Sequence, residues 1–337
     1  GGINVEKLLD EIESYWSTRT EGYSEVNHKE LAGTQKNAWL KVLTSQFPDK
    51  PKEEIRILDI GTGPGFFPVI LAEAGYHVDA VDYTEGMLEK AKENAGDLCR
   101  NIRFLRMDAQ KLDFEDNTFD VVISRNLTWN LEHPDVAYRE WVRVLKVGGR
   151  LLNFDANWYG YLYEEEQRKA YENDRKNVEN NSLDDHYLCT DIERMERIAL
   201  QVPLSKISRP QWDVKTLREA GLLGIRTDTE IWKTVWSEEE RLNYQSTPMF
   251  MVTGVKPDHF LNLPVAAGEK TEGFLELGDG EFVLPATIIR GKDPGKTVLV
   301  TAGLHAGEYV GIQTLIELSK KLNPEKVNGK LILVKVL

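Results

Sequence analysis

The chain has 337 residues, a length that predicts about two domains. Apolar residues make up 41% and charged residues 29%, which is the profile of a folded protein and excludes a disordered one. The formal net charge of −13 argues against nucleic acids and anionic membranes as partners. We therefore expect a small-molecule ligand, no nucleic-acid partner and no membrane partner.

The cysteine content and the hydropathy predict a cytoplasmic protein. Cys99 and Cys189 are too few for a disulfide framework and are expected to be reduced thiols. No stretch approaches the roughly 20 apolar residues that span a bilayer. Gly1 and Gly2 are followed at once by charged sequence, so we expect no signal peptide there.

The first 255 residues have the pattern of an α/β domain. Residues 3–46 carry apolar side chains at helical spacing and are predicted to be helical. From residue 55, short apolar runs alternate with helical segments, which predicts a parallel sheet with helices on both faces. The expected strands are 55–60, 77–82, 102–107, 119–124, 150–155, 224–232 and 248–255, with a short polar link between the last two.

An insertion at residues 157–212 interrupts this alternation. The segment is rich in Tyr, Glu and Arg and is predicted to be helical. Ligands of α/β folds bind at the carboxyl ends of the strands, and this segment leaves that end of the fifth strand. We therefore expect a cap over the ligand; a surface decoration that helps to pack the sheet is the alternative.

Residues 256–337 are predicted to form a second, small α/β domain. Two strand-like segments, 271–277 and 281–284, flank a Gly-Asp-Gly hairpin signal. A strand at 297–302, a helix at 309–322 and a strand at 330–337 follow. We expect the last strand to lie at a sheet edge, where unpaired backbone groups recruit a partner. The segment is then expected to dock on the first domain or to form a homodimer with a second copy of the chain.

A glycine-rich turn follows the first expected strand. Gly61, Gly63 and Gly65 let the backbone turn tightly and let a ligand approach it closely. Asp82, at the end of the next strand, is placed to accept hydrogen bonds from the hydroxyl groups of a ribose. An adenosine-type ligand is therefore indicated.

Two departures from the dinucleotide-binding pattern favour S-adenosylmethionine (SAM) over NAD. The third glycine of that pattern is absent, because the position is occupied by Phe66. Asp59, just before the turn, would repel a pyrophosphate but suits a ligand with an ammonium or sulfonium charge.

Five segments, in order and at the usual spacing, resemble the class I SAM-dependent methyltransferases. They are 58–65, 81–88, 107–109, 119–126 and 143–151. The resemblance implies a Rossmann-like, seven-stranded sheet, SAM as the cofactor, and a methyltransferase domain at residues 1–255. The residues that it places around SAM are Asp59, Gly61, Thr62, Gly63 and Gly65 at the methionine part, Asp82 at the ribose, Tyr83, Met87, Asp108 and Ala109 at the adenine, Asn126 and Leu127 beside the sulfonium, and Tyr15, Trp16, Arg19 and Tyr23 on a covering helix. The last four could instead be packing aromatics with a solvated arginine.

Three residues are candidates for a general base, which methyl transfer needs only when the acceptor is protonated. They are His133, Asp155 and His186. His133 precedes a proline and could instead mark the start of a helix. Trp129, Trp158 and Tyr159 could wall an acceptor pocket by stacking or cation–π contact, or could be ordinary core residues.

A second motif lies in the C-terminal segment. His305 and Glu308, three residues apart after an expected strand, are placed to bind one zinc ion. With the elements around them, residues 268–337 resemble the start of the succinylglutamate desuccinylase/aspartoacylase family, zinc-dependent deacylases related to M14 carboxypeptidases. That family uses a further histidine much later in the chain, and no histidine follows His305 here. A catalytic zinc needs three protein ligands, so we expect an incomplete site that holds no zinc tightly.

The favoured interpretation is a SAM-dependent methyltransferase that acts on a small molecule and carries a partial deacylase-like domain. Two alternatives stay open. One is a fragment of a bifunctional methyltransferase and deacylase, which a downstream histidine in a longer reading frame would support. The other is a non-catalytic SAM-binding assembly module, which cofactor binding without turnover would support.

Overall fold

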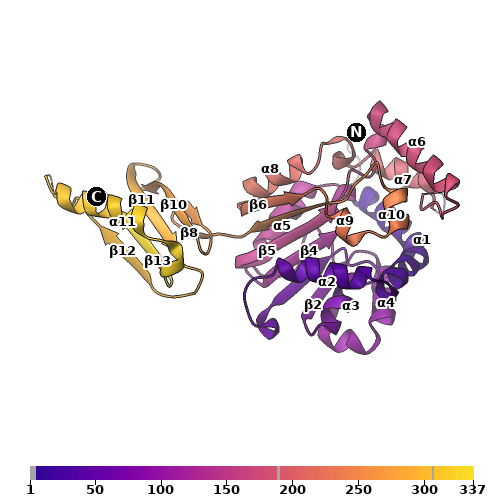
Figure 1. Ribbon diagram of the computed structural model, residues 1–337, viewed down its shortest axis with the longest axis horizontal. Helices are drawn as coiled ribbons and strands as arrows, with labels where there is room; N and C mark the ends of the chain where they lie inside the picture. The colour runs from indigo at the N-terminus through magenta and orange to yellow at the C-terminus, as the bar shows by residue number, and fades with distance from the viewer. Residues whose placement is uncertain (1–4, 188–189, 306) are drawn as a thin grey trace. The chain divides into compact units, whose positions relative to one another are not determined.

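The computed structural model describes residues 5–187, 190–305 and 307–337, so Cys189 lies outside the described residues (Figure 1). The chain divides into two compact units, residues 1–254 and 255–337. No helix among the described residues is both long enough and apolar enough to cross a membrane.

The first unit is built on a seven-stranded sheet with the strand order β3-β2-β1-β4-β5-β7-β6. The strands are β1 (Arg56–Ile60), β2 (His77–Asp82), β3 (Ile102–Arg106), β4 (Phe119–Arg125), β5 (Leu145–Asp155), β6 (Leu223–Asp228) and β7 (Phe250–Val255). Strands β1 to β5 pair in parallel, so their carboxyl ends meet at one edge. This sheet confirms the predicted Rossmann-like α/β fold.

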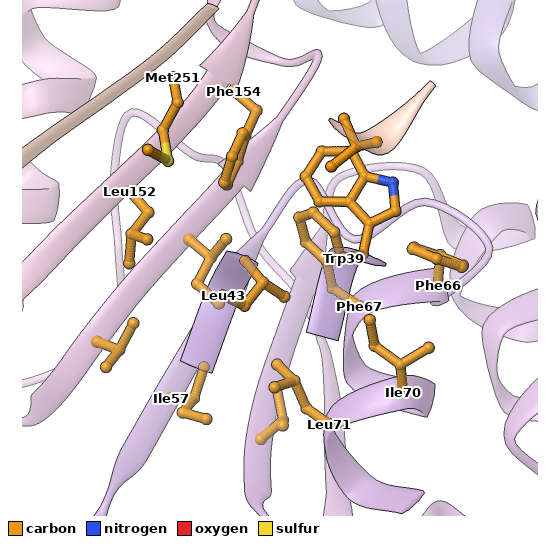
Figure 2. Close-up of a cluster of buried hydrophobic side chains, with 14 of the residues drawn as sticks. Trp39, Leu43, Ile57, Phe66, Phe67, Ile70, Leu71, Leu152, Phe154 and Met251 are labelled. Atoms are coloured by element: carbon orange, nitrogen blue, oxygen red, sulfur yellow. The ribbon is translucent and has the colours of Figure 1, made fainter. Parts of the chain in front are cut away.

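Helices cover both faces of this sheet. Neighbouring strand residues point to opposite sides, and the strands carry apolar residues on both, so each face needs a cover. Ile57 on β1 packs in a core with α2 (Gln35–Ser45) and α3 (Phe66–Glu73), where Trp39 lies 5.1 Å from Phe67 between ring centroids (Figure 2). Leu58, the next residue, belongs to the opposite core with α5 (Pro134–Val144) and α8 (Gln211–Glu219). Helix α4 (Glu85–Ala95) follows β2 and packs against β2 and β3.

The N-terminal helix and the insertion pack together. The long helix α1 (Val5–Ala32) shares a buried cluster with α7 (Ile192–Ala199), in which Tyr15 and Met195 are 3% and 2% exposed. The insertion is helical in the structure. Besides α7 it holds the short helix η4 (Gly160–Leu162), α6 (Glu165–Asn180) and the short helix η5 (Pro203–Lys206).

The expected short link between the last two strands is wrong. Strand β6 ends at Asp228, and the chain then forms α9 (Trp232–Val235) and α10 (Glu238–Asn243) before β7 begins. The reason is a capping signal, because the Ser237 hydroxyl accepts a hydrogen bond of 3.2 Å from the backbone N–H of Glu240. The extra helices bring several polar and aromatic side chains to the edge of the sheet.

The second unit contains a four-stranded sheet with the order β10-β11-β13-β12 and a small hairpin. The elements are β8 (Asp258–Phe260), β9 (Leu263–Val265), β10 (Lys270–Leu277), β11 (Phe282–Arg290), β12 (Thr297–Thr301), α11 (Tyr309–Lys321), the short helix η6 (Pro324–Lys326) and β13 (Lys330–Val334). The predicted hairpin is present as the antiparallel pair β10–β11.

The last strand does not lie at the edge of its sheet, so that expectation is wrong. Strand β13 pairs with β11 on one side and in parallel with β12 on the other. Its apolar run explains the interior place, because Ile332 and Leu333 point to opposite faces and both are buried in core clusters. The edge strands are β10 and β12.

Candidate active site

The three glycines of the turn after β1 have positive φ angles of 71°, 55° and 88°. A Cβ atom on Gly61 would lie 2.8 Å from the Leu127 side chain, and one on Gly65 would lie 3.0 Å from the Cβ of Ala91. A Cβ atom on Gly63 would meet no described atom within 4 Å. Gly61 and Gly65 therefore allow close packing, whereas Gly63 faces the open space in which a ligand would lie.

Two carboxyl groups lie beside this turn, the half-buried one of Asp82 and the buried one of Asp59. One oxygen of Asp82 accepts a 2.8 Å hydrogen bond from the Gly63 N–H, and the other accepts one of 2.9 Å from the Thr84 N–H. Asp59 is 3% exposed, and its burial raises its pKa to about 7. A cationic ligand group beside Asp59 would lower this pKa, because it would stabilise the charged carboxylate.

Three further buried side chains here have polar atoms without a hydrogen-bond partner among the described residues. They are both amide atoms of Asn27, the hydroxyl of Thr62 and the side-chain oxygen of Asn126. Buried polar atoms in native proteins are normally paired, so three unpaired groups around one space indicate a polar ligand. Asn126 also has a φ of 56°, in the left-handed region that Asn adopts more readily than most non-glycine residues.

These groups line one cavity, which we call the first cavity. It is bounded by the glycine turn, the ends of β1, β2 and β4, and one side of α1. Twelve residues that the sequence analysis placed around the cofactor line this cavity: Trp16, Tyr23, Asp59, Gly61, Thr62, Gly63, Asp82, Tyr83, Met87, Ala109, Asn126 and Leu127. Four predicted cofactor residues, Tyr15, Arg19, Gly65 and Asp108, do not line it. The Asp108 carboxylate instead accepts a 2.9 Å hydrogen bond from the backbone N–H of Gln110.

A second cavity adjoins the first. Both are lined by Trp16, Tyr23, Arg125 and Asn126, so a ligand in one lies next to a ligand in the other. The second cavity is walled by α1, the insertion and the α9–α10 segment. The predicted acceptor residues Trp129, Trp158 and Tyr159 line it, and so do Tyr15 and Arg19, which were predicted for the cofactor.

Arg125 is fixed at the junction of the two cavities. Its guanidinium group lies 2.8 Å from the carboxylate of Glu30 on α1, and both side chains are largely buried. The same group lies 4.9 Å from the ring centroids of Phe66 and Phe67. This buried pair therefore ties α1 to the end of β4 between the cavities.

Two of the three candidate bases do not face the cavities. His133 is the residue before the first turn of α5, its side chain is 48% exposed, and it lines neither cavity. Asp155 is fully buried and lines neither cavity; its carboxylate lies 2.6 Å from the Arg209 guanidinium and accepts hydrogen bonds from the Trp129 and Ala156 N–H groups. Asp155 thus holds the fold together, which corrects its expected role as a base.

The third candidate, His186, lines the second cavity. Its two ring nitrogens lie 2.8 Å from a Glu239 carboxylate oxygen and 2.9 Å from the Tyr244 hydroxyl oxygen.

Several lining residues were not predicted from the sequence. Asn27 and Glu30 follow the aromatic positions on the same helix, but a polar residue in a long helix gives no signal of a ligand. The α10 residues were missed together with their helix, although Ser237 and Glu240 form a capping pattern that could have revealed it. The lining residues that were not predicted include Asn27, Glu30, Arg125, Trp236, Glu239, Glu240 and Tyr244.

We expect the change Asp82→Asn to weaken S-adenosylhomocysteine binding by about 1–3 kcal/mol, because an amide replaces a charged acceptor for ribose hydroxyls. Isothermal titration calorimetry measures this change. The matched control is Asp79→Asn on the same strand, where the carboxylate pairs with Arg103 at 2.7 Å and lines neither cavity. Equal affinities in the wild type and Asp82→Asn would contradict this placement of the ribose.

Part of the first unit is similar in sequence to known methyltransferases. A family model described as a methyltransferase domain matches residues 58–153. The chain is 41% identical over 98 residues to the demethylmenaquinone methyltransferase of Clavibacter sepedonicus, covering 29% of this chain and 39% of that one. It is 31% identical over 149 residues to the same enzyme of Renibacterium salmoninarum, covering 44% of this chain and 60% of that one. Among solved structures, phosphoethanolamine N-methyltransferase 2 of Haemonchus contortus with SAM aligns at a TM-score of 0.48 and 19% identity, covering 66% of this chain and 53% of that one.

The first unit therefore contains a class I SAM-dependent methyltransferase domain, and this prediction from the sequence is confirmed. The chain spans less than two thirds of the length of the two demethylmenaquinone methyltransferases. The matching family model does not extend into residues 255–337.

Proposed function

We propose that the protein transfers a methyl group from SAM in the first cavity to a small molecule in the second. The observation that carries this proposal is the junction at which both cavities share Tyr23, Arg125 and Asn126. SAM would supply a methyl group made electrophilic by the positive charge on its sulfur.

The residues of the first cavity fit this cofactor. The buried carboxyl group of Asp59 and the half-buried one of Asp82 suit an ammonium group and ribose hydroxyls, respectively. The unpaired amide of Asn27 and the hydroxyl of Thr62 offer further hydrogen bonds. The open space beside Gly63 leaves room for the ligand next to the backbone.

The residues at the junction would orient the acceptor and exclude water from it. Asn126 lines both cavities and has a buried amide oxygen without a partner among the described residues. Arg125 is held in one place by Glu30 and by the aromatic rings beneath it. Orientation and removal of water account for much of the rate enhancement in a displacement of this kind.

The second cavity supports an acceptor with a flat, unsaturated ring. Among the described residues, the aromatic side chains that line it are Tyr15, Trp16, Tyr23, Trp129, Trp158, Tyr159, Tyr187, Trp236 and Tyr244. Aromatic walls favour stacking with a planar ligand. Relatives that match the chain are named for demethylmenaquinone, which supports a quinone-type ring as the acceptor. We also propose that the insertion caps this cavity, to which it contributes His186, Tyr187 and Met195.

The test is an assay with SAM and a panel of acceptors that includes a naphthohydroquinone, a simple phenol and an alkylamine. We expect S-adenosylhomocysteine to form with the hydroxyl-bearing aromatic acceptors, as measured by mass spectrometry. Binding of SAM without turnover on any acceptor would contradict the proposed activity and favour the assembly-module alternative. Turnover with the alkylamine alone would contradict the proposed acceptor class.

We further propose that the second unit is the first part of a deacylase-like zinc domain, either a fragment of a bifunctional enzyme or an appendage. The order of β12, a loop with His305 and Glu308, and α11 supports this idea. The His305 Nδ1 atom lies 3.1 Å from a Glu308 carboxylate oxygen, and both side chains are exposed. No group of three or more potential ligands occurs among the described residues.

We expect well under one zinc ion per chain after dialysis, because two exposed ligands do not hold a catalytic zinc firmly. Metal analysis by mass spectrometry measures this ratio, with a His305→Ala variant as the background. Stoichiometric zinc in the wild type, or hydrolysis of N-acyl amino acids, would mean that further ligands come from outside the described residues.

We also propose a homodimer through the second unit, but with a different pairing strand from the one that the sequence predicted. Because β13 is an interior strand, pairing would have to use β10 or β12. Both edge strands expose apolar side chains: Phe274 and Leu277 on β10 are 61% and 38% exposed, and Val298 and Leu299 on β12 are 48% and 54% exposed. Sedimentation equilibrium tests the proposal, and a monomer at all concentrations would contradict it.

A further inference from the structure

A chain of three hydrogen-bonded side chains lies on the wall of the second cavity. A carboxylate oxygen of Glu239 lies 2.8 Å from Nε2 of His186, and Nδ1 of His186 lies 2.9 Å from the hydroxyl oxygen of Tyr244. All three residues line the cavity. Glu239 lies on α10, Tyr244 follows that helix, and His186 belongs to the insertion.

The backbone around His186 is held by Asn243, the last residue of α10, which precedes Tyr244. The side-chain oxygen of Asn243 accepts a 3.0 Å hydrogen bond from the His186 N–H, and its amide donates one of 3.1 Å to the Asp184 carbonyl. Asn243 is itself 1% exposed. The insertion is thereby fastened to α10 at the place where the three side chains meet, so their alignment is built into the fold.

The chemistry of the three groups assigns the protons. A carboxylate can only accept, so the Nε2 atom of His186 donates to Glu239 and carries a hydrogen. In the neutral imidazole the Nδ1 atom is then bare and accepts the hydroxyl proton of Tyr244. The hydroxyl oxygen of Tyr244 keeps lone pairs with which it can accept a proton from a ligand in the cavity.

We propose that Tyr244, His186 and Glu239 form a proton relay that takes the hydroxyl proton of an aromatic alcohol, which is the class of methyl acceptor. This proposal rests on the proposed function. The O–H bond of the acceptor breaks as an O–H bond forms on Tyr244. The original Tyr244 proton moves to Nδ1 of His186, and the resulting imidazolium ion is stabilised by Glu239 until it releases a proton to solvent. The acceptor keeps the electron pair with which it attacks the methyl group.

The charges around the relay support transfer through Tyr244 rather than a lasting charge on it. Burial raises the pKa of Tyr244 well above its usual value, and the nearby Tyr187, Tyr23 and Glu240 raise it further. The neutral hydroxyl is therefore the stable form, and it must pass on its own proton as it receives another. Tyr23 lines both cavities, which places this electrostatic neighbourhood beside the junction.

The carboxyl groups of Glu25, Glu30, Asp184 and Glu240 also line the cavity, and Glu240 is the strongest competitor for the role of base. Burial raises the pKa of Glu240 to about 7, and the neighbouring Glu30 contributes in the same direction. The Glu240 carboxylate accepts a 2.7 Å hydrogen bond from the Gln35 amide. Further charged groups in this region are Asp184, which lines the cavity, and the half-buried ion pair of Arg175 with Asp185. The experiment must therefore separate Tyr244 from Glu240.

The first readout is the ionisation of a bound phenol, with no methyl transfer involved. The probe is 4-nitrophenol, whose neutral and ionised forms absorb at different wavelengths, bound to the protein loaded with S-adenosylhomocysteine. We expect the wild type to bind the ionised form preferentially. Tyr244→Phe and His186→Gln should lower the ratio of ionised to neutral bound probe about tenfold or more, the size expected for one lost proton acceptor. Tyr171→Phe is the matched control, because Tyr171 stacks on Tyr161 in the same region and lines neither cavity.

The second readout is turnover with the best hydroxyl-bearing acceptor of the panel. Tyr244→Phe should lower kcat by about a hundredfold with a small change in KM, which is the usual size of a lost general base. The deficit should shrink at high pH, where solvent ionises the acceptor. A merely structural role of Tyr244 or His186 would not produce this pH-dependent recovery.

The outcomes are distinguishable. Unchanged probe ionisation and kcat in both Tyr244→Phe and His186→Gln would overturn the relay, and so would a loss confined to Glu240→Gln. Failure of the wild type to bind 4-nitrophenol would overturn the acceptor class and the relay together. A wild type that ionises the probe but transfers no methyl group to any acceptor would leave the relay standing and contradict the proposed function.

Discussion

Replacing Arg209 with methionine is expected to lower the free energy of unfolding by about 3–5 kcal/mol, as is usual when one partner of a buried ion pair is removed. The Arg209 side chain is 1% exposed and lies 2.6 Å from Asp155 and 2.8 Å from Asp213, both fully buried. Asp213 also accepts the hydroxyl proton of Tyr138 on α5. Without the guanidinium group, two buried carboxylates would have no cation, and the end of β5 would separate from α8.

Urea denaturation followed by circular dichroism measures this loss. Arg139→Met is the matched control, because its ion pair with Asp135 is exposed and should contribute less than about 1 kcal/mol. A variant that also carries Asp155→Asn and Asp213→Asn should recover part of the stability, since no unpaired charge would then be buried. If Arg209→Met were as stable as the control, Asp155 would not have the structural role that its contacts indicate.

The affinity for S-adenosylhomocysteine is expected to fall about tenfold per pH unit below pH 7, and to be nearly constant above it. The raised pKa of Asp59, about 7, means that the free protein holds a proton there in mild acid. Pairing with the ligand's ammonium group requires the carboxylate, so binding below pH 7 must release that proton. Asp59→Asn should abolish this pH dependence and weaken binding above pH 7 by about ten- to a hundredfold, the size of a lost charged hydrogen bond.

Calorimetry in buffers of different ionisation enthalpy measures both the affinity and the proton release. Adenosine is the control ligand, because it lacks the amino-acid part and should bind with little dependence on pH. The same acid-dependent loss for adenosine, or an unchanged pH profile in Asp59→Asn, would show that another group titrates.

The cofactor half of the site could be predicted from the sequence because its signals are local. The glycines after β1 and Asp82 after β2 lie at fixed distances along the chain, and parallel pairing alone brings them to one edge. The prediction fails where side-chain contacts decide. Asp155 has the right place at a strand end, but Arg209, 54 residues later, occupies its carboxylate. No sequence pattern around Asp155 or Arg209 predicts that the two side chains pair.

The acceptor half could be predicted only in part, because it is assembled from segments far apart. The aromatic residues after β4 and β5, Trp129, Trp158 and Tyr159, do line the second cavity. Glu30 meets Arg125 across 95 residues, and Tyr244 meets His186 across 58. Polar residues on helices are common and carry no local mark of such a partner. The same limit explains the misplacement of β13, whose position depends on the strand with which it pairs.

Helix α1 contributes walls to both cavities, with Asn27 in the first, Tyr15 in the second, and Trp16 and Tyr23 in both. A ligand in either cavity contacts this helix, so binding in one cavity restrains a wall of the other. The second ligand then meets a wall whose remaining motion is already reduced, which lowers the entropic cost of its own binding. The cofactor and the acceptor should consequently bind with positive cooperativity, and thermodynamic linkage requires each to strengthen the other by the same factor. Each ligand is therefore bound more tightly while the other is present, and more weakly once the other has dissociated.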